Sequence, residues 1–235
     1  MIYHDMAEHV EEFRPGFVLY SGNMSGGKTD QMISDLQRAK VAGRRVQAFK
    51  VSWDDRYEDG FITANNGQKK FPAISVPDFG GLINRLDPEL EVLGIDELQF
   101  WEDRTIEFIK EHRDLMKIIG TGLQYDFRGN PFPLRSQKGK EFDSKRHIGE
   151  LMSLAIKDEK CWPICTHKEG ERVCGMPAFY VQRWNALGKL SLSGEPTLGV
   201  GKVVRDEAEG QEQFRQGNCA YAVRCAEHYV NPIGK

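Results

Sequence analysis

Phe17-Val-Leu-Tyr20 leads directly into Ser21-Gly-Asn-Met-Ser-Gly-Gly-Lys-Thr29, and no other stretch of the chain is as informative. The first four residues form a short apolar run that is typical of a buried strand. From Gly22 to Thr29 the sequence fits the pattern G-x-x-x-x-G-K-[ST]. A strand, a glycine-rich loop and a helical segment in this order predict a loop whose backbone N–H groups bind phosphate oxygens.

This phosphate loop, residues 22–29, predicts an ATP site that includes Mg²⁺. We expect Lys28 to reach the β- and γ-phosphates and the Thr29 hydroxyl to bind the metal. The remaining positions are expected to surround the phosphates: Gly22, Asn23, Met24, Ser25, Gly26 and Gly27. The competing interpretation is a glycine-rich turn that contains a lysine by chance, since it would match the same sequence pattern. The apolar strand before the loop and the helical pattern after it favour the ATP site.

Outward from the loop, helical and strand patterns alternate. We expect helices at residues 30–42, 79–86 and 105–112, and strands at 45–51, 73–76, 92–95 and 116–120. Such alternation is typical of βαβ units and predicts an α/β fold with a mainly parallel sheet. A change of composition near Ala155 predicts an ATP-binding domain over residues 1–154 and a smaller domain over 155–235. Within the latter, residues 189–216 show weak periodicity, and we expect a long loop there.

Asp96 and Glu97 follow the apolar run Val92-Leu-Gly-Ile95 and form the second chemical signal. A carboxylate at the end of such a strand is where phosphate-loop enzymes hold Mg²⁺, which we expect of Asp96. The adjacent Glu97 is a candidate general base for an attacking hydroxyl. The competing interpretation is an acidic cap on the next helix.

Asp54 and Arg56, after the strand expected at 45–51, give a weaker signal. The forked guanidinium of Arg56 suits phosphate or acceptor binding, and Asp54 is a candidate to orient it or a metal. A solvated run of charges would look the same.

All five cysteines lie in the last third of the chain: Cys161, Cys165, Cys174, Cys219 and Cys225. An odd number without a secretory signal disfavours a disulfide framework and favours metal binding. Cys225 and His228 have the C-x2-H spacing that lets one turn present two ligands to zinc. From spacing alone, the other ligands come from Cys161, Cys165 and Cys174, and the choice stays open.

Composition disfavours two classes of partner. The net charge is −3, and no basic patch suggests binding to nucleic acid. No apolar run approaches the roughly 20 residues of a membrane span, and residues 1–14 do not read as a signal peptide. We therefore expect a cytoplasmic protein without membrane or nucleic-acid partners.

These motifs together resemble the type II thymidine kinases. The phosphate loop corresponds to the family's G-P-M-F-S-G-K-[ST], Lys50–Tyr57 to K-x-x-x-D-x-R-Y, and Ile95–Phe100 to I-D-E-x-Q-F. Farther along, Gly122–Gly129 corresponds to G-L-x-x-D-F-R-G, residues 174–183 to C-G-x-x-A-x-x-x-x-R, and Tyr221–Tyr229 to Y-x-x-x-C-x-x-H-Y. The motifs occur in the family's order from about Phe17 to Tyr229.

The resemblance implies a RecA-like α/β core, a zinc-binding lasso domain and a homotetramer. It implies that Glu97 deprotonates the 5′-hydroxyl of the nucleoside, that Thr29 and Asp96 serve Mg²⁺, and that Lys28, Arg56 and Gln99 surround the phosphates. It places the nucleoside among Met24, Leu123, Phe127, Phe132 and Tyr221. For Leu123, Phe127 and Phe132, ordinary core packing is the competing interpretation.

The family register also implies a zinc ligand set. Counting back from Ala178 and Arg183 makes Cys174 the second cysteine of the family's C-x2-C pair. Cys165 is then the first, with residues 166–173 inserted between them, although Cys161 remains a rival. The implied structural zinc ligands are Cys165, Cys174, Cys225 and His228. His167 is expected to be a solvated loop residue and Cys219 a spare thiol.

The implied activity is phosphorylation of thymidine by ATP, giving dTMP and ADP. Two departures bear on the choice of nucleoside, because Ser25 replaces the family's loop phenylalanine and Asn23 replaces its proline. Deoxyuridine or a modified pyrimidine deoxynucleoside is therefore the alternative substrate. A RecA-like ATPase that depends on nucleic acid is the alternative class, and the acidic charge balance disfavours it.

Overall fold

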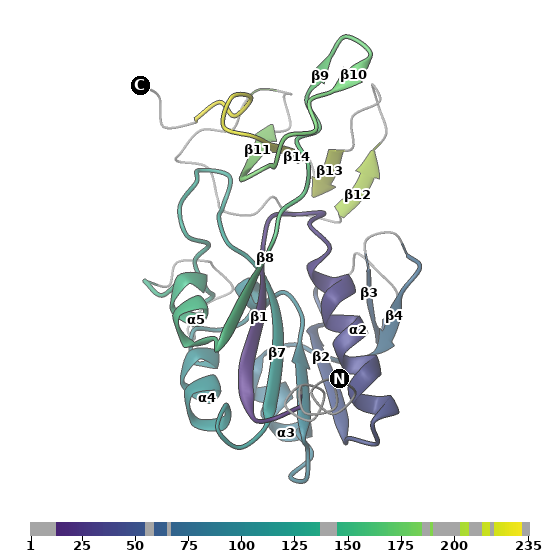
Figure 1. The fold of residues 1–235 in the computed structure, drawn as a ribbon. Coiled ribbons are helices and arrows are strands. Elements are labelled where there is room, and N and C mark those ends of the chain that lie inside the picture. The colour runs from purple at the N-terminus through teal and green to yellow at the C-terminus, as the bar shows by residue number, and fades with distance from the viewer. Residues whose placement is uncertain are drawn as a thin grey trace, which may run out of the picture.

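A computed structural model describes residues 13–54, 59–64, 67–136, 145–184, 189, 203–206, 213–216 and 219–231. Figure 1 shows an α/β body and, beyond one end of it, a smaller region made of strands. The prediction at Arg56 lies outside the described residues.

A six-stranded sheet forms the centre of the α/β body, in the order β5-β2-β6-β7-β1-β8. Every neighbouring pair is parallel, which confirms the predicted mainly parallel α/β fold. The strands are β1 (Gly16–Gly22), β2 (Val46–Val51), β5 (Ile74–Val76), β6 (Val92–Ile95), β7 (Lys117–Leu123) and β8 (Lys157–Cys161).

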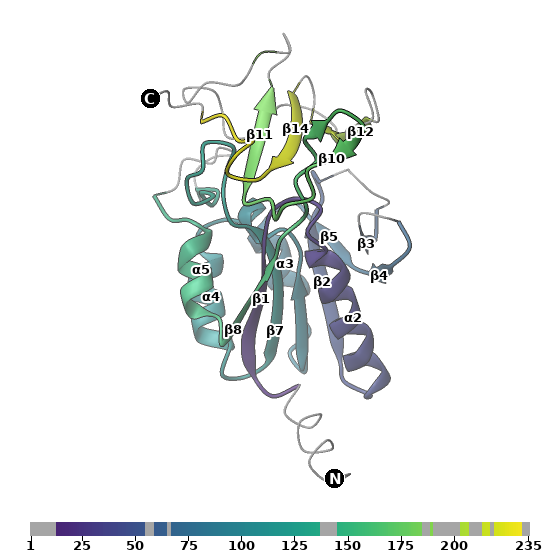
Figure 2. The same ribbon diagram turned by 45° about the horizontal axis from the view of Figure 1, so that its top comes forward.

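Helices cover both faces of this sheet (Figures 1 and 2). On one face lie α2 (Lys28–Val41) and the hairpin of β3 (Phe61–Thr63) and β4 (Lys70–Pro72). On the other lie α3 (Phe79–Arg85), α4 (Thr105–His112) and α5 (Ile148–Leu154). β1 alternates between the two apolar clusters, because Phe17 and Leu19 belong to one while Val18 and Tyr20 belong to the other. A strand buried on both faces reads as a continuous apolar run, which is the signal seen at residues 17–20.

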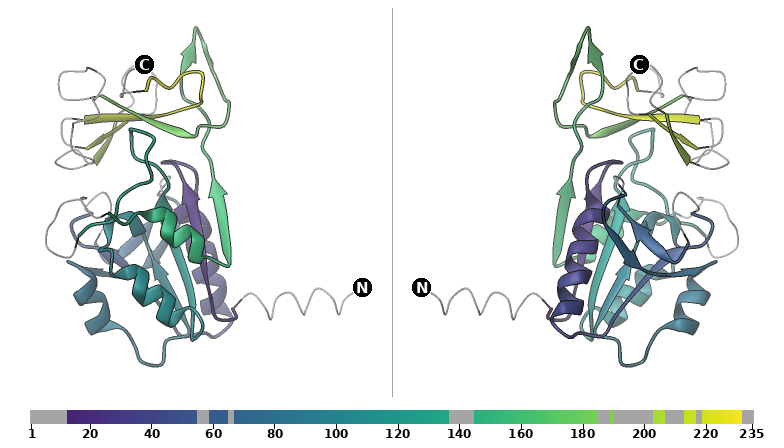
Figure 3. Two further views of the ribbon diagram at one scale, coloured as in Figure 1. Left: turned by 90° about the vertical axis from the view of Figure 1, so that its left-hand side faces the viewer. Right: turned by 90° about the vertical axis from the view of Figure 1, so that its right-hand side faces the viewer.

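The carboxyl ends of the central strands meet at one edge of the sheet, as parallel pairing requires. β1 ends there in the phosphate loop, β6 in Asp96 and Glu97, and β2 in the segment that holds Asp54. Figures 1 and 3 show the smaller region beyond this edge.

The smaller region contains an antiparallel sheet in the order β11-β14-β13-β12. Its strands are β11 (Tyr180–Trp184), β12 (Val203–Asp206), β13 (Gln213–Gln216) and β14 (Cys219–Arg224), and a hairpin of β9 (Lys168–Glu169) and β10 (Arg172–Val173) precedes them. The predicted loop over 189–216 is wrong for residues 203–206 and 213–216. Their sequences, Val203-Val-Arg-Asp206 and Gln213-Phe-Arg-Gln216, do not alternate apolar and polar residues, so they give no period-2 signal.

β8 lies after residue 154 yet pairs with β1 over Val18–Gly22. The expected division between residues 1–154 and 155–235 would separate it from the sheet that it completes. We therefore propose that the chain divides after Cys161, where β8 ends.

The end of β8 packs closely against the phosphate loop. A Cβ atom at Gly22 would lie 2.3 Å from the carbonyl oxygen of Cys161, and one at Gly26 would lie 2.0 Å from the same atom. A backbone atom cannot swing aside as a side chain can. Both positions therefore require glycine.

We expect Gly26→Ala to destabilise the fold by about 1–3 kcal/mol, because the added methyl group overpacks a rigid contact. Gly43→Ala is the matched comparison, because Gly43 has a φ of +77° and open space around it. That substitution should cost about 1 kcal/mol from backbone strain alone. Urea unfolding measures both, and a Gly26→Ala protein as stable as the parent would contradict the close contact.

Candidate active site and metal centre

The phosphate loop has the backbone of an anion-binding turn. Ser25 and Gly27 have positive φ angles of 60° and 84°, and α2 begins immediately afterwards at Lys28. The buried Lys28 ammonium donates a hydrogen bond to the carbonyl oxygen of Asn23 at 2.6 Å. The loop thus places a cation and the positive end of a helix around one concave stretch of backbone, the arrangement that binds phosphate.

Asn23 connects this loop to the smaller region. Its side chain is fully buried, and its amide donates to the carbonyl oxygen of Ala178 at 3.0 Å. The next residue, Met24, packs against the cluster of Cys165, Ala178, Val223 and Cys225. The side chain of Asn23 therefore faces the smaller region, and its backbone faces the loop.

Asp96 and Glu97, the acid pair, lie in a tight turn after β6. Glu97 has φ 51° and ψ 57°, a left-handed conformation that costs a residue with a side chain about 1–2 kcal/mol. Its N–H donates to the Thr121 hydroxyl at 2.8 Å, and that hydroxyl donates to Asp96 Oδ1 at 2.6 Å. The indole of Trp101 donates to the carbonyl oxygen of Asp96 at 2.9 Å. The turn is thus fixed at several points.

Gln99 lies behind the acid pair. It is fully buried, its amide nitrogen donates to Glu97 Oε2 at 2.6 Å, and its amide oxygen accepts from the Leu123 N–H at 2.9 Å. The resemblance placed Gln99 around the phosphates. That placement stays a prediction, and in the structure both ends of the amide are bonded within the protein, to Glu97 and to the backbone of Leu123.

The residues expected around the nucleoside are divided between the α/β body and the smaller region. Phe132 belongs to the large core cluster, against which Leu123 packs. Tyr221 belongs to a small cluster with Val181, against which Met24 packs. Phe127 is buried, and the guanidinium carbon of Arg183 lies 3.7 Å from its ring centroid.

Asp54 is half-buried, and its N–H donates to the carbonyl oxygen of Val51 at 3.2 Å. It lies at the end of β2, which is next to β6 in the sheet.

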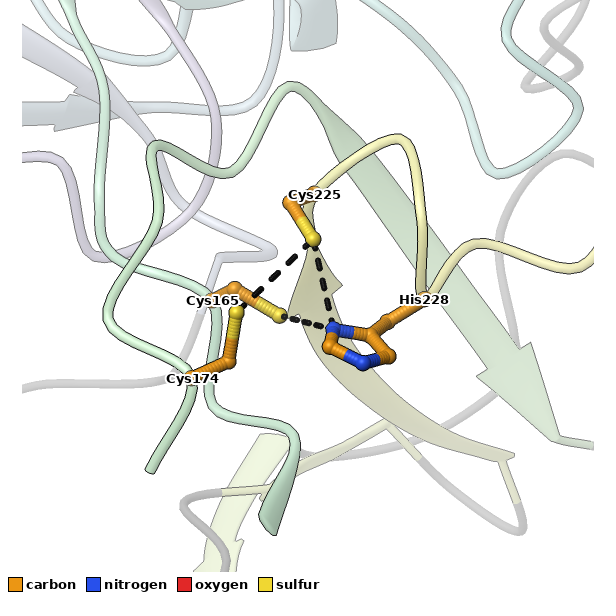
Figure 4. Close-up of side chains that lie close together, drawn as sticks. All are labelled: Cys165, Cys174, Cys225 and His228. Carbon is orange, nitrogen blue, oxygen red and sulfur yellow. Dashed lines mark hydrogen bonds between the residues drawn. The ribbon is translucent and has the colours of Figure 1, made fainter. Parts of the chain in front are cut away.

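Cys165, Cys174, Cys225 and His228 converge in the smaller region (Figure 4). Their ligand atoms all lie within 4.8 Å of one another. The measured separations are 3.3 Å from Cys225 Sγ to His228 Nδ1, 3.7 Å from Cys165 Sγ to the same nitrogen, and 3.9 Å between Cys174 Sγ and Cys225 Sγ. A tetrahedral zinc ion with ordinary bond lengths needs edges of about 3.5–3.8 Å. We call this group the metal centre, and its donors are compatible with structural zinc.

The thiol of Cys225 is suited to metal binding. Burial acts to raise its pKa, but hydrogen bonds from the N–H groups of His228 and Glu227, together with those from the thiols of Cys165 and Cys174, outweigh burial and lower the pKa to about 7. A substantial fraction is therefore thiolate at neutral pH, the form that binds metal.

The other cysteines lie elsewhere. Cys161 is buried at the end of β8, beside the phosphate loop. Cys219 packs against Val181 and Tyr221. Neither contributes to the metal centre.

The inserted hairpin contributes contacts that the sequence did not reveal. The His167 ring stacks on the His228 ring, with the two ring centroids 4.0 Å apart. His167 is a half-buried loop residue, and this contact adds to the expectation of a solvated loop position. Glu169 on β9 lies 3.0 Å from His228 Nε2. A carboxylate bonded to the far nitrogen of a metal-binding histidine fixes the ring and the tautomer.

We expect Glu169→Ala to weaken zinc binding by about 10- to 100-fold, the usual cost of losing such a support. Glu171→Ala is the control, because Glu171 is exposed on the same hairpin. Competition with a chromogenic chelator measures both affinities. Equal zinc affinity in the Glu169 and Glu171 variants would show that the carboxylate does not support His228.

Within the described residues, no helix combines the length and the hydropathy needed to cross a bilayer.

Comparisons with known proteins agree with this geometry. The family model described as thymidine kinase matches residues 16–229. A thymidine kinase of Thermococcus kodakarensis is 30% identical over 231 residues, which cover 95% of this chain and 99% of the relative. A thymidine kinase of Pyrobaculum aerophilum is 29% identical over 217 residues, which cover 92% and 98%. On this full-length match, together with the phosphate loop and the acid pair, the chain belongs to the thymidine kinase family.

Proposed function

We propose that this protein transfers the γ-phosphoryl group of ATP to the 5′-hydroxyl of thymidine, giving dTMP and ADP. One observation carries the proposal: the phosphate loop and the acid pair lie at the same edge of one parallel sheet, in a chain of the thymidine kinase family. Phosphoryl transfer needs mainly positioning and charge neutralisation, and this edge supplies groups for both.

The phosphate loop is the proposed donor site. Its backbone N–H groups and the start of α2 surround the phosphates, and the Lys28 ammonium exchanges the Asn23 carbonyl for phosphate oxygens. Thr29 and Asp96 are the proposed Mg²⁺ residues, and Mg²⁺ would neutralise charge on the β- and γ-phosphates. Asp54 and Arg56 are proposed to complete the site from the β2 side.

Glu97 is the proposed general base. Its carboxylate accepts the proton of the 5′-hydroxyl as that oxygen attacks the γ-phosphorus. The new bond joins the 5′-oxygen to phosphorus, and the bond to the β–γ bridging oxygen breaks and leaves ADP. The hydrogen bond from Gln99 holds one carboxylate oxygen of Glu97 in place.

The nucleoside is proposed to lie among Met24, Leu123, Phe127, Phe132 and Tyr221. The contacts of Met24 support this proposal. Its side chain packs both against the apolar cluster that contains Cys165 and Cys225 and against the cluster that contains Tyr221. The side chain of Met24 thus links the proposed ATP site to the smaller region.

Zinc is proposed to be structural. Four protein ligands leave no open position for chemistry. The cluster that contains Cys165 and Cys225 also contains Ala178, the residue that accepts the hydrogen bond of Asn23. A bound zinc ion would therefore stabilise the surface on which the phosphate loop rests.

The resemblance to the family supports two further proposals, a homotetramer and a cytoplasmic location. The net charge of −3 supports the proposal that nucleic acid is not a partner.

A second acceptor is favoured by one observation. Ser25, at a positive φ of 60°, stands where the resemblance expects phenylalanine, so the loop offers less apolar surface to a base. Deoxyuridine or a modified pyrimidine deoxynucleoside is the candidate.

A panel of deoxynucleosides with ATP and Mg²⁺, scored for 5′-monophosphate, tests both acceptors. We expect thymidine to give the highest kcat/KM. Faster conversion of deoxyuridine than of thymidine would show that deoxyuridine is the preferred acceptor. No conversion of any pyrimidine deoxynucleoside would contradict the proposed function.

We expect Glu97→Gln to lower kcat by about 10²- to 10⁴-fold, the usual contribution of a general base. ATP affinity should change little, because Glu97 is not part of the phosphate loop. Glu111→Gln, an exposed position on α4, is the isosteric control and should keep full activity. Unchanged turnover in Glu97→Gln would remove Glu97 from the mechanism.

A further inference from the structure

Thr121 places a hydroxyl where the pattern of β7 calls for an apolar side chain. Two residues earlier, Ile119 lies on the same face of the strand and belongs to the core beneath α2. Thr121 is also fully buried. A buried hydroxyl is costly unless its hydrogen bonds are made, so the contacts of this one show what it does.

Both hydrogen bonds of the Thr121 hydroxyl go to the acid pair. It accepts from the Glu97 N–H at 2.8 Å and donates to Asp96 Oδ1 at 2.6 Å. The sheet register explains this, because Ile95 on β6 lies beside Gly120 on β7. One step further along, Asp96 and Thr121 are neighbours.

The hydrogen bond from the Glu97 N–H to Thr121 depends on the backbone conformation of Glu97. Glu97 has φ 51° and ψ 57°, a conformation that a residue with a side chain keeps only where its surroundings require it. In this conformation its N–H points at Thr121. Without the hydroxyl, the N–H loses its acceptor, and the left-handed conformation of Glu97 loses the hydrogen bond that stabilises it.

β7 holds the same glutamate at a second point. The Leu123 N–H, two residues beyond Thr121, donates to Gln99 Oε1 at 2.9 Å, and Gln99 Nε2 donates to Glu97 Oε2 at 2.6 Å. Gln99 is fully buried. One strand thus fixes the backbone of Glu97 through Thr121 and its carboxylate through Gln99.

We propose that Thr121 and Gln99 are positioning residues for phosphoryl transfer, which together hold the Glu97 carboxylate toward the nucleoside hydroxyl. This inference rests on the proposed role of Glu97 as general base. Neither residue needs to touch the substrate, since both act through Glu97.

The first test compares Thr121→Val, which keeps the shape and loses the hydroxyl, with Thr121→Ser, which keeps the hydroxyl. We expect Thr121→Val to lower kcat by about 10- to 100-fold, the effect of misplacing a catalytic group by about an ångström. Thr121→Ser should retain most of kcat. The ADP dissociation constant should stay within about twofold in both, because the phosphate loop is untouched. Equal kcat in the two variants would overturn the proposal.

A double-mutant cycle tests whether Thr121 acts through Glu97. In a Glu97→Gln protein, Thr121→Val should cause little further loss of kcat, because residues that act as a unit are strongly non-additive. Full additivity of the two losses would overturn the proposal. A Mg²⁺ titration of the Thr121 variants reports any separate effect through Asp96.

For Gln99, the readout is the pH dependence of kcat in Gln99→Met. A hydrogen bond donated to a carboxylate favours its charged form. Its loss should move the acid limb of the profile to higher pH, and an unmoved acid limb would contradict the role of Gln99.

Crystal structures of Thr121→Val and Thr121→Ser test the geometry without any assay. Glu97 should keep its positive φ in the serine variant and leave it in the valine variant. A positive φ in both would overturn the positioning role of Thr121, whatever the substrate proves to be. Absence of nucleoside phosphorylation in the parent protein would instead overturn the proposed function.

Discussion

The parallel pairing of β1, β7 and β6 is the constraint on which the site depends. It brings the phosphate loop, the Thr121 hydroxyl and the acid pair to one edge of the sheet, although they lie far apart in the chain. The pairing also fixes the axial register, so that Thr121 meets Asp96 and Glu97 without help from flexible segments. If the pairing register between β6 and β7 shifted by one residue, the Thr121 hydroxyl would point to the opposite face of the sheet from the acid pair.

Local patterns were enough to predict the centre of the fold. The run at residues 17–20, the phosphate loop and the helix that follows are contiguous signals. β6 has the bounds that its apolar run predicts, and α4 has those that its helical pattern predicts. The four residues of the metal centre were also predicted, although only the resemblance to a family separated Cys165 from Cys161.

The remaining features depend on contacts between distant segments. β8 is polar in sequence, Lys157-Asp-Glu-Lys-Cys161, and its place in the sheet follows from pairing with β1. The stacking of His167 on His228 depends on how the inserted hairpin folds back. The positions of Thr121 and Gln99 depend on the register of two strands. No signal in the neighbouring sequence reports such contacts, because each becomes visible only when both partners are in place.

The hydrogen bond between Asn23 and Ala178 has unequal ends. The donor is a side chain, whereas the acceptor is a main-chain carbonyl that any residue at position 178 would retain. A substitution at position 23 therefore removes this hydrogen bond between the phosphate loop and the smaller region, whereas a substitution at position 178 leaves the acceptor in place. The packing of Met24 against the smaller region does not depend on either change. Over evolutionary time, this hydrogen bond is therefore vulnerable to substitution at its donor end only.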